Sequence, residues 1–122
     1  MTTQQIADRV VALNREGDYK TIYNEFYTDE TVSVENWGPT PERYVGIDAI
    51  RAKAEQWEKG VEEVRETHVS DALVSDNSFA IVFTMDVSFT EESGMKDQSG
   101  KMSELAVYHV RDGKIVHEEF CS

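Results

Sequence analysis

The sequence predicts an α+β fold in which three N-terminal helices cover an antiparallel sheet. Up to about Lys59, apolar residues recur at spacings of three and four, the pattern of one buried helix face. From Val61 onward the period changes to two, the pattern of strands with one buried face. The last part of the chain, Lys101–Phe120, has two apolar-rich runs that flank Asp112-Gly113, which is typical of a β-hairpin. Helices followed by strands favour an arrangement with the helices together on one face of the sheet.

Length, charge and cysteine content exclude several classes of protein. The 122 residues can form one core, so we expect a single domain over residues 1–122. Twelve basic against 24 acidic residues give a net charge of −12, which argues against binding to nucleic acid or to anionic membranes. No segment approaches the roughly 18 apolar residues of a membrane span. Cys121 is the only cysteine, no charged-then-apolar leader opens the chain, and the three histidines lack metal-binding spacing; we therefore expect a cytoplasmic protein without disulfide, metal or cofactor.

The first two predicted helices follow each other closely. Thr2 or Thr3 can cap the first helix, and Gly17 can end it in the left-handed conformation. Asp18 can cap the second helix. The inner residues of the first helix are Ile6, Val10 and Leu13. The second carries a stripe of large residues that predicts a wide buried surface, formed by Tyr19, Ile22, Tyr23, Phe26 and Tyr27.

A strand and a loop separate these helices from the third one. We expect the strand at Thr31–Glu35 and the loop at Asn36–Val45, which holds both prolines of the chain. The third helix runs from about Asp48 to Lys59, and Gly60 ends it. Its inner face consists of Ile47, Ile50, Ala54 and Trp57.

Four strands then form an antiparallel meander, at Val64–Val74, Phe79–Thr90, Met102–Val110 and Lys114–Phe120. In the second of them the odd positions from Phe79 to Phe89 are all large and apolar, so we expect this face against the core. A four-residue loop at 75–78 pairs Val74 with Phe79 and turns His68 toward Met85, whereas a loop one residue shorter or longer would reverse this. The polar, glycine-bearing stretch Glu91–Gly100 indicates a connection at a cavity mouth or a sheet edge.

The final hairpin places acidic residues among aromatic ones. A three-residue loop of Arg111, Asp112 and Gly113, with a glycine bulge, pairs Val110 with Lys114. Counting back sets Tyr108 opposite Val116, Ala106 opposite Glu118, and Glu104 opposite Phe120. Glu104 and Glu118 are then diagonal neighbours roughly 7–8 Å apart. We therefore expect both acids on one face, together with Tyr108, Val110 and Phe120.

A resemblance to a known family rests on the order and spacing of three segments. They are VALNREGDYKTIYNEFYTDETVSVE, GIDAIRAKAEQW and ELAVYHVRDGKIVHEEF. The chain resembles the SnoaL-like and ketosteroid-isomerase-like branch of the nuclear transport factor 2 superfamily. The resemblance implies a cystatin-like, nuclear transport factor 2-like cone, in which a curved antiparallel sheet is covered by three N-terminal helices. It also implies a deep, largely apolar pocket inside the cone.

The resemblance also bears on chemistry. The stretch TDETVSVEN puts Glu35 where ketosteroid isomerases hold their carboxylate base. The two oxyanion donors of those enzymes do not carry over, because their positions fall at about Arg9 and Ala106. The loss of one such donor can cost on the order of 3 kcal/mol of transition-state stabilisation. The resemblance therefore argues against steroid isomerisation by that constellation and favours the SnoaL-like proteins, which include polyketide cyclases and dehydratases.

Glu35 is the first candidate for a catalytic residue. If it faces the pocket, as the resemblance implies, neighbouring aromatic side chains would raise its pKa toward the range of a working base. The alternative is a strand-end acid in solvent or in an ion pair with Lys53. For Lys53, beside Ile50 and Trp57 on the third helix, the solvated face is the favoured interpretation over an inward one that neutralises an acid.

His68 and Glu104 are the other two catalytic candidates. A histidine can donate or accept a proton near neutral pH, although on an inward strand face it is more often a core residue. Glu104 and Glu118 could share a proton or bracket His68, since paired carboxylates in a cavity push their pKa values apart. The alternative is that both acids are solvated or paired with arginine or lysine.

Eight further residues are expected to contact a ligand. They are Tyr23, Trp37, Tyr44, Phe83, Met85, Tyr108, Glu118 and Phe120. A stripe of tyrosines on a helix is usually a core feature, yet one hydroxyl group exposed to the pocket could orient a ligand carbonyl.

The convex face of the predicted sheet carries apolar residues too, namely Leu105 and Val107. An antiparallel sheet can leave one face in water, so a second apolar face suggests that something covers it. In the family that the chain resembles, the cover is usually another copy of the sheet, which implies a homodimer. Polar Thr84 and Asp86 on the neighbouring strand weaken this expectation.

Two hypotheses of function result. In the first, the protein binds a small apolar carbonyl or polyketide-like molecule and acts as a cofactor-free isomerase, cyclase or dehydratase by proton transfer, with Glu35 as base and His68 or Glu104 as the acid. In the second, it is a non-catalytic ligand-binding or dimerisation module. An open cavity in which these side chains converge would favour the first, and a filled cone with its acids paired to basic residues would favour the second.

Overall fold

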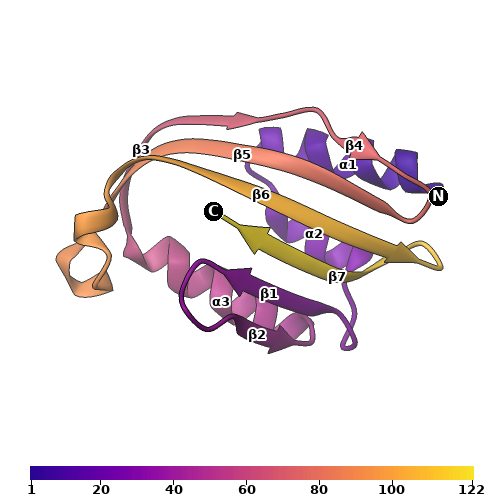
Figure 1. Ribbon diagram of the computed structural model, residues 1–122, viewed down its shortest axis with the longest axis horizontal. Helices are drawn as coiled ribbons and strands as arrows, with labels where there is room; N and C mark the ends of the chain where they lie inside the picture. Colours follow the sequence, from indigo (N-terminus) through magenta and orange to yellow (C-terminus); the bar gives the residue numbers. More distant parts are fainter.

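The computed structural model describes residues 1–122 as three α-helices and a seven-stranded sheet (Figure 1). The helices are α1 (Thr3–Arg15), α2 (Tyr19–Phe26) and α3 (Ile47–Gly60). The strands are β1 (Val32–Asn36), β2 (Glu42–Val45), β3 (Val61–Val69), β4 (Leu73–Val74), β5 (Ser78–Phe89), β6 (Gly100–Arg111) and β7 (Lys114–Cys121). Two short 3₁₀ turns, η1 (Glu91–Ser93) and η2 (Lys96–Gln98), connect β5 to β6.

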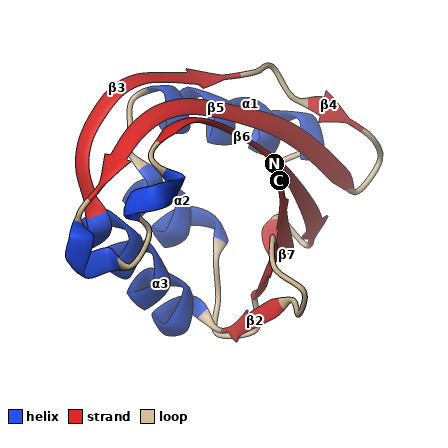
Figure 2. Ribbon diagram, turned by 60° about the vertical axis from the view of Figure 1, so that its left-hand side comes forward, coloured by secondary structure: helices blue, strands red, loops and turns tan.

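The strands form one open, curved sheet in the order β2-β1-β7-β6-β5-β3, with β4 paired to β5. Figure 2 shows the sheet curving around the side on which α2 and α3 lie. Three N-terminal helices on the concave face of a curved sheet confirm the predicted α+β cone. No helix combines the length and the apolar character that a membrane crossing requires.

Strands β1 and β2 extend the sheet beyond the predicted four-strand meander. Strand β2 occupies the second half of the predicted loop and pairs antiparallel with β1. Strand β1 in turn pairs with β7, and this is the one parallel pair in an otherwise antiparallel sheet. The parallel register sets Ser33 beside Glu118 and Glu35 beside Phe120. The sheet is therefore mixed, and β1 brings two polar residues to the concave face of the final hairpin.

The predicted helix signals are confirmed at both ends of α1 and at the start of α2. The Thr2 side chain accepts a hydrogen bond from the Gln5 backbone at 3.1 Å, and the Gln5 side chain accepts one from the Thr2 backbone at 2.9 Å, which forms a capping box. Gly17 follows α1 with a φ of 74°. Asp18 then accepts a hydrogen bond from the Thr21 backbone at 3.1 Å and caps α2.

The hydrophobic core lies between the helices and the middle of the sheet. Its buried members include predicted inner residues of each helix and odd positions of β5, among them Ile6, Val10, Ile22, Ile50, Phe79 and Ile81. Phe83 and Met85, further along the same face of β5, are only partly buried and line a cavity. The core therefore closes one end of the cone and leaves space at the other.

The final hairpin has a tighter turn than the predicted three-residue loop. Asp112 and Gly113 both have positive φ values, 51° and 75°, so that a two-residue loop pairs Arg111 with Lys114. A bulge next to Val110 then shifts the register again, so that Tyr108 lies opposite Glu118 and Ala106 opposite Phe120. The predicted pairs are wrong by two residues. Because two one-residue shifts preserve the alternation of faces, the acids still lie on the predicted face.

His68 lies on the opposite face from the predicted one. Val74 pairs with Phe79 as expected, but the ladder slips by one residue between β4 and β3, and His68 pairs with Thr84 instead of Met85. The cause is Ser70, whose side-chain oxygen accepts the hydrogen bond of the Val82 backbone at 2.8 Å in place of a backbone carbonyl. His68 is therefore exposed on the outer side of the sheet.

Candidate functional site

A cavity of about 280 Å³ lies between α2, α3 and the concave face of the sheet. Thirteen of its 20 lining residues are hydrophobic. Glu35, Glu104 and all eight residues predicted to contact a ligand line this cavity: Tyr23, Trp37, Tyr44, Phe83, Met85, Tyr108, Glu118 and Phe120. His68 does not line it, so the prediction that His68 converges with the two acids is wrong.

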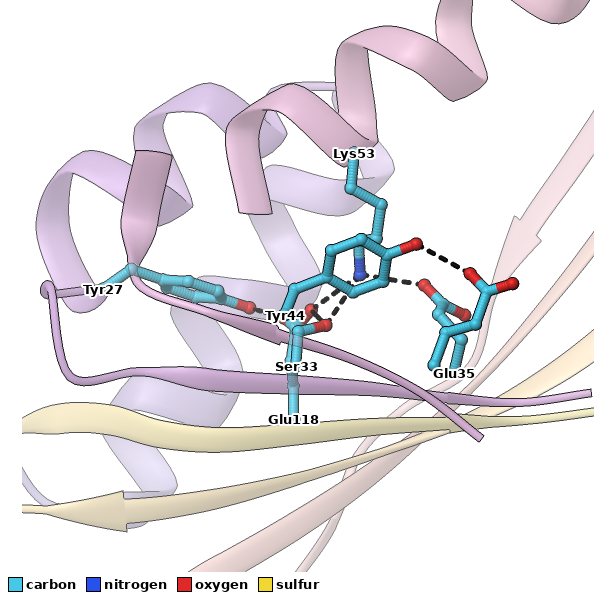
Figure 3. Close-up of polar contacts among 7 residues, drawn as sticks. Tyr27, Ser33, Glu35, Tyr44, Lys53 and Glu118 are labelled. Atoms are coloured by element: carbon cyan, nitrogen blue, oxygen red, sulfur yellow. Dashed lines mark hydrogen bonds and ion pairs between the residues drawn. The ribbon is translucent and has the colours of Figure 1, made fainter. Parts of the chain in front are cut away.

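Lys53 reaches from α3 into the cavity and contacts three acceptors (Figure 3). Its Nζ lies 2.6 Å from Ser33 Oγ, 2.8 Å from Glu35 Oε1 and 3.4 Å from Glu118 Oε2. An ammonium group has three N–H donors, so these acceptors use all of them. The Lys53 side chain is only 16% exposed. The favoured interpretation of Lys53 as a residue of the solvated face is therefore wrong.

Two aromatic rings complete the surroundings of the Lys53 ammonium. Its Nζ lies 5.2 Å from the ring centre of Tyr44 and 4.9 Å from that of Phe120. Both distances are in the range of a cation–π interaction. The Tyr44 hydroxyl donates a hydrogen bond to Glu42 at 2.7 Å, and this bond is the main reason why the pKa of Tyr44 rises to about 12.

Glu118 is a buried anion with three partners. It is 1% exposed, and it accepts hydrogen bonds from the Tyr27 hydroxyl and, at 2.5 Å, from Ser33 Oγ, besides its ion pair with Lys53. Burial of a carboxyl group without hydrogen bonds or an ion pair is costly, and these three partners offset that cost. Burial, and then the negative charge of Glu118, raise the pKa of Tyr27 well above its ordinary value. The oxygens of Glu118 are thus occupied by the protein itself.

Glu35 satisfies both interpretations drawn from the sequence, because it lines the cavity and also pairs with Lys53. Burial raises the pKa of Glu35, and this effect outweighs the opposing effect of the Lys53 charge. The carboxyl group is therefore held in place at the cavity wall while its proton affinity stays above the ordinary value.

Glu104 is the partly buried carboxyl group of the cavity that has no protein partner. No hydrogen bond or ion pair reaches it, and it lies on β6 opposite Phe83. Burial, helped by the negative charge of Glu35, raises the pKa of Glu104 to about 7. Near neutral pH this group is therefore free to gain and to release a proton.

Two tyrosines add polar groups to the aromatic wall. The hydroxyl groups of Tyr23 and Tyr108 form no hydrogen bond with the protein, and both residues line the cavity. Burial raises the pKa of both phenols, with the charge of Glu118 as the second cause, so both remain protonated donors. The Tyr108 ring is fixed by stacking on Phe79 at 4.8 Å between ring centres.

Three residues of this network were not among the predicted site residues, although Lys53 had been considered as an inward partner of an acid. Ser33 lies two positions before Glu35 in β1, so the alternation of the strand would have placed both on one face. Lys53 lies three positions after Ile50 and four before Trp57, which puts it on the inner stripe of α3. Tyr27 was assigned to a core stripe, and its bond to Glu118 depends on tertiary structure alone. No group of three or more His, Cys, Asp or Glu residues is arranged to hold a metal ion.

The family model of the SnoaL-like domain matches residues 1–122. The chain belongs to the SnoaL-like family. No curated protein matches it. A solved structure from Mesorhizobium loti, described as a candidate SnoaL-like polyketide cyclase with carbohydrate phosphatase as a second description, is 27% identical over 100% of both chains, with a TM-score of 0.88.

Two more distant structures share the fold of this SnoaL-like chain. An NTF2-like protein from Burkholderia thailandensis is 17% identical over 99% of this chain and 90% of its own, with a TM-score of 0.76. A candidate SnoaL-like polyketide cyclase from Jannaschia sp. CCS1 is 15% identical over 98% of this chain and 85% of its own, with a TM-score of 0.74. At these identities the likeness concerns the fold.

Proposed function

We propose that the cavity binds a small, largely apolar carbonyl or polyketide-like compound, and that the protein isomerises, cyclises or dehydrates this compound by proton transfer without a cofactor. The observation that carries the proposal is Glu104, an unpartnered carboxyl group in an aromatic-walled cavity with a pKa of about 7. A general acid or base works best when its pKa lies near the operating pH. Glu104 meets that condition.

The other cavity groups suit the remaining roles. Glu35, predicted as the base, serves here as a second proton carrier, with its position fixed by Lys53. The free hydroxyl groups of Tyr23 and Tyr108 can donate to the oxygen of an enolate, a role for which the ketosteroid-isomerase positions Arg9 and Ala106 offer nothing. His68, on the outer face, has no part in the proposal.

The charge of the cavity favours one of the two descriptions given to the Mesorhizobium loti protein. The cavity lining contains Glu35, Glu42, Glu58, Glu104 and Glu118, against the single basic residue Lys53. Such a lining repels a phosphate group. We therefore extend polyketide-like chemistry to this chain and leave phosphate esters aside.

Deuterium exchange into a simple ketone tests the chemistry without knowledge of the natural substrate. In D₂O, the protein should accelerate the loss of the α-proton NMR signals of 2-tetralone, because a base removes the proton and solvent returns a deuteron. Glu104→Gln should lose most of this acceleration, whereas the exposed control Glu30→Gln, outside the cavity, should keep it. Equal exchange rates for the wild type, Glu104→Gln and buffer would refute proton transfer at Glu104.

A second candidate is a non-catalytic binding module with the same cavity. It is favoured by one observation: Glu35 and Glu118 are both paired with Lys53, as structural acids would be. Binding of 2-tetralone without any acceleration of exchange would support this module over the enzyme.

We also propose that a second copy of the chain covers the outer face of the sheet. Val82 and Leu105 are opposite each other on β5 and β6, and they are 38% and 41% exposed. Together they form an apolar patch on that face. Sedimentation equilibrium should find a dimer, and Leu105→Lys should shift the population to monomer; a monomeric wild type at high concentration would exclude this assembly. A cytoplasmic location stays a prediction from the lone cysteine.

A further inference from the structure

The charge and the walls of the cavity narrow the class of compound that fits it. This inference rests on the proposed function, since it assumes that the cavity holds a small ligand. Five glutamates and one lysine line the space, together with nine aromatic residues: Tyr19, Tyr23, Tyr27, Trp37, Tyr44, Trp57, Phe83, Tyr108 and Phe120. Acidic groups and aromatic faces in the same space both attract cations.

Lys53 does not neutralise this excess of negative charge. Its three N–H donors are directed at Ser33, Glu35 and Glu118, so none remains for Glu104. With these acids ionised, Glu35, Glu118 and Lys53 together leave one negative charge, and Glu104 adds a second. The charge of Lys53 acts on Glu104 only from a distance and is outweighed by burial and by the charge of Glu35, so the protein supplies no direct ion-pair partner for Glu104.

The same cavity already holds one ammonium group in this manner. Lys53 Nζ lies between a carboxylate at 2.8 Å and the aromatic rings of Tyr44 and Phe120. Glu104 provides a comparable setting without a cation, because it is partly buried on the aromatic wall next to Phe83 and lines the same space as Tyr23 and Tyr108. A carboxylate on an aromatic wall with no internal partner is suited to an external ammonium group.

We propose that the carbonyl compound of this cavity is also an organic cation, an amine with an apolar body, whose ammonium group pairs with the ionised form of Glu104, the form that acts as a base. The apolar part lies against the aromatic and methionine side chains of the wall. The raised pKa of Glu104 agrees with this pairing, because burial and the charge of Glu35 disfavour its carboxylate form and an ammonium group beside it would offset both effects. An anionic ligand of the same shape would be repelled by the same groups.

Three probes that share one apolar body test the proposal. They are 3-phenylpropylamine, 3-phenylpropan-1-ol and 3-phenylpropanoate, measured at about pH 8, where the amine is charged and the carboxyl groups are ionised. Binding can be followed by the fluorescence of Trp37 and Trp57, which line the cavity. The amine should bind about tenfold more tightly than the alcohol, as expected for one partly buried charge pair, and the carboxylate should bind most weakly.

The variant Glu104→Gln should abolish the preference for the amine and leave the alcohol affinity nearly unchanged, because Glu104 has no protein partner to lose. Glu30→Gln removes the same charge at an exposed site and should leave all affinities unchanged. An alcohol that binds as tightly as the amine, or an amine preference that survives Glu104→Gln, would overturn the inference while leaving the cavity a ligand site. If none of the three probes bound, the proposed function would fail together with it.

Discussion

Lys53 on α3 and Glu35 on β1 form an ion pair of 2.8 Å inside the cone, and the same ammonium group lies 3.4 Å from the buried Glu118. One cation from the helical layer therefore connects two carboxylates of the sheet. The pair has two consequences: it stabilises charges that the sheet could not hold alone, and it leaves the partly buried Glu104 without a partner.

Replacement of Lys53 by methionine should destabilise the fold, because it leaves Glu35 and Glu118 without their cation. Loss of one partner of a buried pair typically costs about 3–5 kcal/mol, and the lower end applies here since Tyr27 and Ser33 still bond Glu118. Urea unfolding at neutral pH measures the change. Lys59→Met, an exposed lysine of the same helix, is the control and should change stability by less than about 0.5 kcal/mol.

The contributions of Lys53 and Glu118 should not be additive. Removal of both charges, in Lys53→Met combined with Glu118→Gln, takes away the cation and the anion that most needs it. The double variant should therefore be more stable than the sum of the single losses predicts, with a coupling free energy of about 1–3 kcal/mol. A double-mutant cycle by urea unfolding gives this value, and a coupling near zero would show that the ion pair contributes little.

The charge of Glu104 should make stability fall as pH rises. The pKa of Glu104 is about 7 in the folded state and near the ordinary value of 4.5 in the unfolded state, so the folded state binds its proton more tightly. The contribution is favourable below pH 4.5 and is lost as pH rises through 7. The difference in Tm between Glu104→Gln and the wild type should therefore shift in favour of the variant as pH rises from acidic to alkaline values. A difference in Tm independent of pH would contradict the shift.

His68→Ala should be close to neutral in both stability and ketone exchange. The residue is exposed on the outer face and makes no hydrogen bond, and surface substitutions of this kind usually stay within about 0.5 kcal/mol. Thermal unfolding and the 2-tetralone assay check the two properties. A strong loss of exchange with an unchanged Tm would return His68 to the site and would contradict the register of β3.

The periodicity of the apolar residues was enough to predict the helices, the strands β5, β6 and β7 and the faces of these three strands that meet the core, whereas the predicted inner face of β3 was wrong. The strand register could not be predicted from this periodicity, because single residues decide it. The Ser70 side chain accepts a hydrogen bond in place of a backbone carbonyl, and the bulge next to Val110 shifts the pairing of the hairpin. The parallel pairing of β1 with β7 joins segments more than 80 positions apart, as in Ser33 and Glu118, and no local pattern encodes it.

The cavity wall was largely predictable, since ten of its predicted members line it, whereas its polar connections were not. Lys53 illustrates the reason. A charged residue on a helical stripe is expected in solvent unless a buried partner of opposite charge is known, and Glu118 becomes such a partner only after the sheet has formed. The position of Lys53 on the helix could have indicated that its side chain points inward. It could not have indicated the buried anion that makes this orientation favourable.

The tight turn and the bulge of the β6–β7 hairpin together decide whether the number of residues between facing positions of the two strands is even or odd. From Tyr108 to Glu118, an even number of positions keeps Glu118 and Phe120 inside the cone. Removal of one residue from either feature alone would turn Glu118 and Phe120 outward. Glu119 would then take the place of Glu118 opposite Tyr108, and Cys121 would take the place of Phe120. The cavity would keep an acid there but lose one of the two aromatic rings beside Lys53. Whether the number of residues in a short surface loop is odd or even therefore decides which side chains of β7 line the cavity.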